Sequence, residues 1–153
     1  MEYQVIYIVI ILAGFVIGKY PKDKLSKVTL LWITLALFIL IIPSYWTITI
    51  GKTSLLAGII LLLIHSFKIQ QNSLIYILGI TIPIIIHLIF TLQNYPYVSS
   101  TRYTQIISII FWILIIIQDK KRSNPNFSAL TMISFWAFLE LILGPQNYVL
   151  KAF

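Results

Sequence analysis

The stretch IISIIFWILIII at residues 106–117 is apolar except for one serine, and LALFILII at residues 35–42 is apolar throughout. A strand of a membrane-spanning barrel alternates apolar and polar side chains, whereas a lipid-embedded helix accepts such a continuous run. In lipid, every backbone polar group needs a partner within the protein, and a helix supplies these partners within one segment. These two stretches therefore predict membrane-embedded helices.

The composition of the chain points to the same environment. Of its 153 residues, 59% are hydrophobic and only 10% are charged, and the mean hydropathy is +0.96. A soluble domain carries about 25% charged residues, and disorder requires low hydrophobicity. Ordinary soluble domains and disordered chains are both excluded, so we expect a protein of the lipid bilayer.

Turn and charge signals divide the chain into six apolar segments, which predict helices at residues 3–18, 28–42, 53–67, 74–92, 104–118 and 127–143. Short connections make successive helices antiparallel neighbours. We therefore expect one all-α domain over residues 1–153, a polytopic transmembrane bundle of six short antiparallel helices. Several segments fall short of the ~20 residues that cross a bilayer. We expect flanking residues such as Tyr45 and Trp46 to lengthen the helices, in preference to local thinning of the bilayer.

The basic residues predict the orientation of the bundle. The net charge is +7, and the first, third and fifth loops hold eight cations: Lys19, Lys22, Lys24, Lys27, Lys68, Lys120, Lys121 and Arg122. The other side holds Lys52, Arg102 and Lys151. Because cytoplasmic loops carry the excess of Lys and Arg, we place loops one, three and five in the cytoplasm and both termini outside. No cation precedes the run Val5–Ile17, so it is expected to remain as a span and not to act as a signal peptide.

Glu140 is the only acidic residue inside a predicted span, and a carboxylate in lipid is expected to face the bundle interior. Glu140 and His87 each lie about 20 Å along their helices from the cytoplasmic end, at 1.5 Å per residue. We therefore expect His87 and Glu140 to share one buried polar site at matching height, through a direct hydrogen bond or a water molecule.

A structural and a functional interpretation of this pair both stay open. In the structural one, which we weight more heavily, Glu140 reaches the outer interface or Arg102, and His87 bonds a carbonyl freed by Pro83. In the functional one, the pair lies in an outward-facing polar pocket, whose rim would be formed by Arg102, Tyr45, Tyr95 and Tyr97.

Small residues recur at helix-packing spacing. Residues 14–18 read GFVIG and residues 54–58 read SLLAG, and small side chains let helix backbones approach closely in lipid. We expect Gly14, Gly18 and Gly58 to lie at helix contacts, within the chain more than between two copies of it.

The sequence shows no catalytic residue, cofactor site or metal site. The chain has no cysteine, and a metal site needs three or more ligands. His65 is about 15 Å in depth from His87 at 1.5 Å per residue, too far for joint ligation. Because hydrolase, metalloprotease and phosphate-loop motifs are also lacking, we do not expect an enzyme. The expected partners are the lipid bilayer and another integral membrane protein or a second copy, and we expect no nucleic acid.

Two function classes follow from these features. The first is a structural or accessory component of the cell membrane, which the small loops and the missing motifs favour. The alternative is a small transporter or solute-binding subunit, for which the site at His87 and Glu140 would be the binding pocket.

In layout, the chain resembles the YphA-type family of small six-span membrane proteins of low-GC Gram-positive bacteria. The likeness lies in the first span, the basic turn Lys19–Lys27, the aromatic hairpin Pro43–Lys52 and the last span near Glu140. It implies six spans and a place in a bacterial cell membrane, and that family has no assigned activity to carry over. Vitamin-capturing transport subunits also have six helices, but their ends are expected in the cytoplasm.

Overall fold

A computed structural model describes residues 2–18, 20–42, 44–68, 74–93, 98–118 and 124–143. The described ranges are almost entirely helical and contain no strand. There are six long helices, and the short helix α5 (Val98–Thr101) and the 3-10 turn η1 (Arg102–Thr104) lie between the fourth and the fifth of them. The long helices are α1 (Glu2–Ile17), α2 (Lys24–Leu40), α3 (Tyr45–Lys68), α4 (Leu74–Leu92), α6 (Gln105–Gln118) and α7 (Phe127–Leu143). The predicted all-α class with six helices is therefore confirmed.

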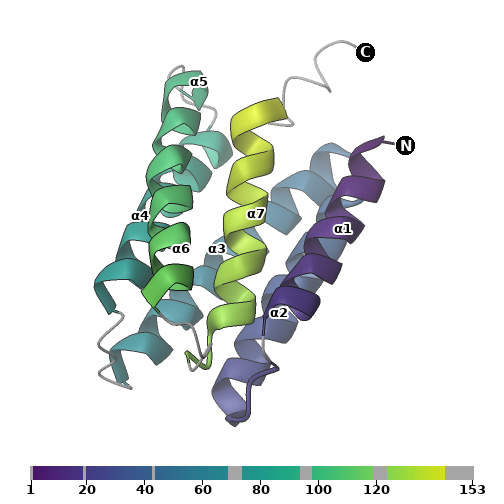
Figure 1. Cartoon of the computed structure of the whole chain (residues 1–153). Coiled ribbons are helices and arrows are strands. Elements are labelled where there is room, and N and C mark those ends of the chain that lie inside the picture. Colours follow the sequence, from purple (N-terminus) through teal and green to yellow (C-terminus); the bar gives the residue numbers. More distant parts are fainter. Residues whose placement is uncertain are drawn as a thin grey trace.

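The helices form two layers, with α6, α7 and α1 in front of α4, α3 and α2 (Figure 1). Each long helix packs against the long helix that follows it in the chain. Helix α7 also packs against α1, and against α2 and α4 of the other layer. Most side chains of α7 are buried, from Phe127 to Glu140. Helix α7 is therefore the centre of the bundle, and a polar residue on it lies in the protein interior.

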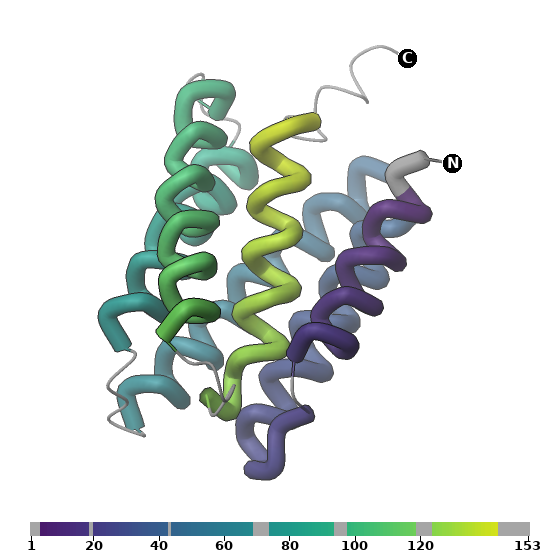
Figure 2. Tube along the Cα trace, in the orientation of Figure 1, coloured from purple at the N-terminus to yellow at the C-terminus, as the bar shows by residue number. Residues whose placement is uncertain are grey.

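Successive long helices run in opposite directions (Figure 2). The start of α1 and the end of α7 lie at the end that is uppermost in Figure 1, which we name the upper end. The ends of α1, α3 and α6 and the starts of α2, α4 and α7 lie at the opposite, lower end. The helix ends that flank the first, third and fifth predicted loops therefore share one end of the bundle.

Helices α4 and α7 have the bounds predicted for them, residues 74–92 and 127–143. Helix α3 begins at Tyr45 rather than at residue 53. A reciprocal cap starts it: the Ser44 backbone N–H donates to Thr47 Oγ1 at 3.1 Å, and the Thr47 N–H donates to Ser44 Oγ at 3.2 Å. Tyr45 and Trp46 thus lengthen this helix, as expected.

This early start corrects the interpretation of Lys52. The sequence pattern places Lys52 among the loop cations, but it lies two turns inside α3 and is only 1% exposed. The preceding Gly51 made a loop the expected structure here, because glycine is more typical of loops than of helix interiors. Of the cations predicted for the outer side, Arg102 lies at the upper end, and Lys151 lies outside the described residues.

Helix α2 begins at Lys24, four residues before its predicted start, because Asp23 caps it. Asp23 Oδ1 accepts hydrogen bonds from the backbone N–H groups of Leu25 at 3.0 Å and Ser26 at 2.9 Å. The helix ends at Leu40, two residues early, and α1 is shifted by one residue from its prediction. The stretch predicted at 104–118 is preceded by α5 and η1, so helical structure runs from Val98 to Gln118.

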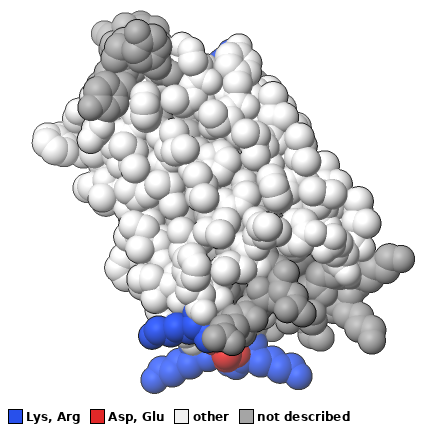
Figure 3. Space-filling view, turned by 90° about the vertical axis from the view of Figure 1, so that its left-hand side faces the viewer, with Lys and Arg blue, Asp and Glu red and all other residues white. Residues whose placement is uncertain are grey.

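The outer surface of the bundle is apolar. Large aliphatic and aromatic side chains are exposed on all six long helices, for example Val16 (78%), Leu31 (60%) and Ile117 (60%). Figure 3 shows one face without charge over its body, and most of the charged side chains in this view lie at the lower end. Three stretches are long and apolar enough to cross a membrane: Tyr45–Lys68, Leu74–Leu92 and Val98–Gln118. This surface suits lipid, because soluble monomers seldom expose apolar patches larger than a few hundred Å².

The three glycines lie at helix contacts within the chain. A Cβ atom at Gly14 would overlap the side chain of Met132 on α7, and one at Gly18 would overlap Ser128 on α7. A Cβ at Gly58 would lie 2.9 Å from Ile33 Cγ1 on α2. These glycines let α1 approach α7, and α3 approach α2, more closely than any larger residue would.

Candidate functional site

His87 on α4 and Glu140 on α7 meet near the upper end of the bundle. His87 Nε2 lies 3.5 Å from Glu140 Oε2, and the two side chains are 0% and 1% exposed. This distance is at the long end for a hydrogen bond. Both helices run upward, so residues at equal distances from their lower ends reach the same height. The structure thus brings the two residues together directly.

The other nitrogen of the His87 ring faces Thr101 of α5. His87 Nδ1 lies 3.1 Å from Thr101 Oγ1, and Thr101 Oγ1 donates to the Val98 carbonyl at 2.9 Å. Thr101 is half-buried, so it connects the buried imidazole with the upper surface of the bundle. The histidine therefore has a polar partner on each side, one near the surface and one in the interior.

Lys52 is the residue of this site that sequence reasoning missed. Its ammonium is close enough to Glu140 for their charges to interact. Yet within the described part of the chain, neither Lys52 Nζ nor Glu140 Oε1 makes a hydrogen bond. An unpaired ionised group is expensive to bury. We name Lys52, His87, Thr101 and Glu140 the upper polar cluster; it joins α3, α4, α5 and α7.

The His87 ring contacts Thr101 and Glu140, and the carbonyl groups of Ile80 and Pro83 accept hydrogen bonds from α6. Ser108 Oγ of α6 donates to the Ile80 carbonyl at 2.8 Å, and Gln105 Nε2 donates to the Pro83 carbonyl at 3.3 Å. The structural interpretation of His87, as the partner of a carbonyl freed by proline, therefore does not describe its contacts. Glu140 likewise lies beside His87 and is buried, so it does not reach the outer interface.

The structure describes two of the four residues predicted to form a pocket rim, Tyr45 and Arg102. Tyr45 is 59% exposed and packs edge-on against Trp46, with ring centroids 5.8 Å apart. Arg102 is half-buried, and its guanidinium donates to the Tyr103 hydroxyl at 3.0 Å. Tyr95 and Tyr97 lie outside the described residues.

A groove of about 180 Å³ lies between α6 and α7. Its lining is almost entirely apolar: Ile109, Trp112, Ser134, Phe135 and Phe138. The rings of Trp112 and Phe135 pack edge-on, 5.3 Å apart. This lining includes no member of the upper polar cluster, so the two features are separate.

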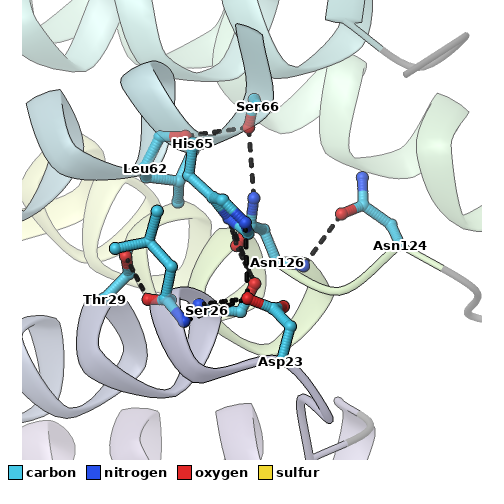
Figure 4. A network of polar contacts seen from close by, with 9 residues as sticks. Asp23, Ser26, Thr29, Leu62, His65, Ser66, Asn124 and Asn126 are labelled. Carbon is cyan, nitrogen blue, oxygen red and sulfur yellow. Dashed lines mark hydrogen bonds and ion pairs between the residues drawn. The ribbon is translucent and has the colours of Figure 1, made fainter. Parts of the chain in front are cut away.

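A second polar network joins α2, α3 and α7 at the lower end (Figure 4). We name Asp23, Ser26, His65, Ser66 and Asn126 the lower polar network. Ser26 Oγ donates to Asn126 Oδ1 at 2.9 Å and lies 3.1 Å from His65 Nδ1, and Asn126 Nδ2 donates to Ser66 Oγ at 3.1 Å. His65 Nε2 lies 3.4 Å from Asp23 Oδ1.

The lower polar network ties three helix ends together while one of its members faces water. Ser26, His65, Ser66 and Asn126 are buried, whereas the Asp23 side chain is 41% exposed. Burial opposes ionisation of Asp23, but the hydrogen bonds from Ser26 and Leu25 and the charge of His65 together hold the pKa of the Asp23 carboxyl below its ordinary value. Sequence reasoning missed this network, because Ser26 and Asn126 lie within segments predicted as loops, where polar residues are expected.

The chemistry of the two clusters is acid–base and hydrogen-bonding chemistry. Among the residues the structure describes, no three His, Cys, Asp or Glu side chains come together to hold a metal ion. The upper polar cluster presents one lysine, one glutamate and one histidine side chain inside an apolar bundle. No protein-family model, curated protein or solved structure matches the chain.

Proposed function

We propose that the chain is a multi-pass integral membrane protein of a bacterial cell membrane, with six crossings and loops one, three and five in the cytoplasm. Its apolar outer surface and the three stretches long enough to span support this placement. Helices α1, α2 and α7 have 16 or 17 residues, so they reach about 24–26 Å at 1.5 Å per residue. Helices of this length fit a locally thinned bilayer, or a bilayer in which the residues that flank each helix lie in the interfacial region. The layout likeness to the YphA-type family supports the same proposal.

We further propose that the protein is a small transporter or solute-binding subunit, and not an enzyme. The observation that carries this proposal is the burial of Lys52, His87 and Glu140, each from a different helix, inside the bundle, with His87 directly against Glu140. Buried ion pairs add little stability, and well-packed apolar residues often replace them without loss. A protein that only packs against partners would have no need of these three groups. Buried ionisable residues in membrane helices typically mark paths for ions or polar solutes.

Copurification in mild detergent followed by native mass spectrometry tests this proposal. We expect the wild-type protein to retain a small bound mass, and Lys52→Met to lose it because the ammonium is the donor of the cluster that has no hydrogen bond within the described residues. Lys68→Met is the matched control, since Lys68 is an exposed lysine at the far end of the same helix. Recovery of no small mass in either form, together with a stoichiometric partner protein, would support the accessory role instead.

A specific feature favours that accessory role as the second candidate. The groove between α6 and α7 is apolar, aromatic and open toward the lipid-facing side of two helices whose outer residues are exposed. A helix of another integral membrane protein would fit such a surface, because close packing drives helix association in lipid. Phe138→Ala, at an exposed position of the groove, would then release the partner while Lys52→Met would not.

A further inference from the structure

We infer that the groove between α6 and α7 binds a membrane-dissolved molecule with an unsaturated ring and a carbonyl group, such as an aromatic ketone or a quinone. The carbonyl oxygen of this molecule accepts a hydrogen bond from the hydroxyl of Ser134. The groove shares no residue with the upper polar cluster, so the inference does not depend on the proposed solute site. It also assigns the groove to a small molecule in place of a helix of another protein.

The first observation is the unpaired hydroxyl of Ser134. This residue is 2% exposed, and within the described part of the chain it is the only buried Ser or Thr whose hydroxyl has no hydrogen-bond partner. Several other buried hydroxyls of the long helices donate to the carbonyl four residues earlier: Thr34, Ser66, Thr81, Thr91 and Thr131. The Ser134 hydroxyl makes no such bond. Because an unpaired hydroxyl is costly in an apolar interior, an acceptor placed beside it would be held there.

The second observation is that the Ser134 side chain lies on the wall of the groove. Phe138 follows it by four residues on α7, so the two side chains share one face of the helix, and Phe135 lies beside them. Ile109 and Trp112, three residues apart on α6, form the facing wall. The free hydroxyl is therefore set among apolar and aromatic side chains that line one hollow.

The shape and the lining of this hollow suit one ring. An apolar cavity of ~150 Å³ holds a benzene molecule, and the groove has about 180 Å³. Its Trp112 and Phe135 rings pack edge-on, 5.3 Å apart, and such aromatic walls favour a further ring in an offset or edge-on contact. The indole N–H of Trp112 already donates to Thr131 Oγ1 at 3.4 Å. Ser134 is therefore the one donor left among the lining side chains.

The depth of Ser134 selects the polar group of the ligand. Ser134 lies seven residues above Phe127, the first residue of α7, so it is about 10 Å up a helix about 25 Å long. At this depth a lipid acyl chain has no acceptor, and phospholipid ester groups lie about 15 Å from the centre of the hydrocarbon core. A carbonyl accepts the Ser134 hydrogen and brings no hydrogen of its own that would need a further acceptor. A carbonyl-bearing ring thus fits the groove better than a phospholipid.

Fluorine NMR of the full chain in phospholipid nanodiscs tests this inference, because the chain has four tryptophans. The protein is labelled with 5-fluorotryptophan, and Trp112→Phe assigns the signal of the groove. The probes are acetophenone and α-methylstyrene, which have the same shape but differ in that a methylene group replaces the carbonyl oxygen. We expect acetophenone to shift the Trp112 signal saturably and more tightly than α-methylstyrene. Trp32 and Trp46, exposed on the outer surface, report on probe dissolved in the bilayer.

Variants separate the hydrogen bond from simple filling of an apolar hollow. Ser134→Ala should weaken acetophenone binding by about 2- to 10-fold, to the level of α-methylstyrene, whose own binding should persist and show that the groove is intact. Thr53→Ala should leave both affinities unchanged, because the exposed Thr53 hydroxyl bonds its own helix.

Three results would overturn the inference. The first is a Trp112 signal that follows the bilayer-exposed tryptophans without saturation, and the second is equal affinity for the two probes or no effect of Ser134→Ala. The third is a stoichiometric partner protein that copurifies and blocks the response of Trp112, which would assign the groove to a helix. None of them decides the proposed solute site, which the bound mass tests separately.

Discussion

At the residue scale, Asp23 has two roles that substitutions can separate. Its Oδ1 caps α2 and also faces His65 at 3.4 Å. The substitution Asp23→Asn would keep an accepting oxygen at the cap, whereas Asp23→Ala would leave the first N–H groups of α2 without this acceptor. We expect Asp23→Ala to lower the free energy of unfolding by about 1 kcal/mol, and Asp23→Asn by clearly less. Titration with denaturing detergent in mixed micelles measures both; equal losses would contradict the capping role.

The acid dependence of stability follows from the same residue. The pKa of the Asp23 carboxyl is lowered in the folded protein from an ordinary value of 3.8. A depressed folded-state pKa contributes stability that is present above 3.8 and is lost as the pH falls through the folded value below it. We therefore expect the stability difference between wild type and Asp23→Asn to shrink on acidification below that point. A difference that stays constant there would show that the carboxylate is not selectively stabilised.

Gly18 and Gly14 should differ in their tolerance of a methyl group. A Cβ at Gly18 would lie 2.6 Å from the Ser128 Cα, which is backbone, while the overlap at Gly14 is with the flexible side chain of Met132. Overpacking typically costs about 1–3 kcal/mol, so Gly18→Ala should fall in that range and Gly14→Ala below it. Val16→Ala, at an exposed position of the same helix, serves as the control and should be near neutral. Equal effects at positions 14 and 18 would disprove this account.

The meeting of His87 and Glu140 could be predicted from the sequence, because two helices that run in the same direction bring residues at equal distances from their lower ends to the same height. Lys52 could not be predicted, since a lysine seven residues from the start of α3 resembles a loop cation when the helix start is placed too late. The lower polar network could not be predicted either. The hydrogen-bond partners of its hydroxyl and amide side chains come from segments far apart in the sequence. Ser26 and Asn126, for example, are brought together only by the fold.

At the element scale, α6 supports the proline-containing helix α4. Ser108 donates to the Ile80 carbonyl at 2.8 Å, across the interface and one turn below Pro83. Side-chain hydrogen bonds between membrane helices average about 0.6 kcal/mol, with a maximum near ~1.7. We expect Ser108→Ala to destabilise the bundle by that amount. Thr53→Ala should have almost no effect in the same unfolding assay, because the exposed Thr53 hydroxyl donates to a carbonyl of its own helix. A loss for Thr53→Ala as large as for Ser108→Ala would contradict the interhelical role.

Element boundaries were predictable where charge or proline ended an apolar run and not where polar residues continued a helix. The predicted bounds of α4 and α7 agree with the structure. The start of α3 was missed by eight residues, because Tyr45–Lys52 contains threonines, a glycine and a lysine. Those residues are accommodated by the Ser44–Thr47 cap and by burial of Gly51 and Lys52 against neighbouring helices. Tertiary packing outweighed local propensity there.

At the scale of the whole molecule, the distribution of exposed cations is lopsided. Lys22, Lys24, Lys27 and Lys68 are exposed at the lower end, and Lys52 no longer counts toward the upper end. Correcting Lys52 therefore strengthens the charge asymmetry on which the proposed orientation rests. In the proposed orientation, the upper end of the bundle, where the upper polar cluster lies, would face the cell exterior.

This orientation predicts the labelling of single-cysteine variants, which the cysteine-free chain allows without background. In intact cells, a membrane-impermeant maleimide should modify Gln93→Cys and Tyr45→Cys, which are exposed at the upper end. It should modify Lys22→Cys and Lys68→Cys only after the membrane is made permeable, because those residues are exposed at the end proposed to be cytoplasmic. Leu55→Cys, fully buried in α3, should react only after denaturation. Labelling of only the lower positions in intact cells would invert the topology, and labelling of both ends would contradict a bundle that spans the membrane.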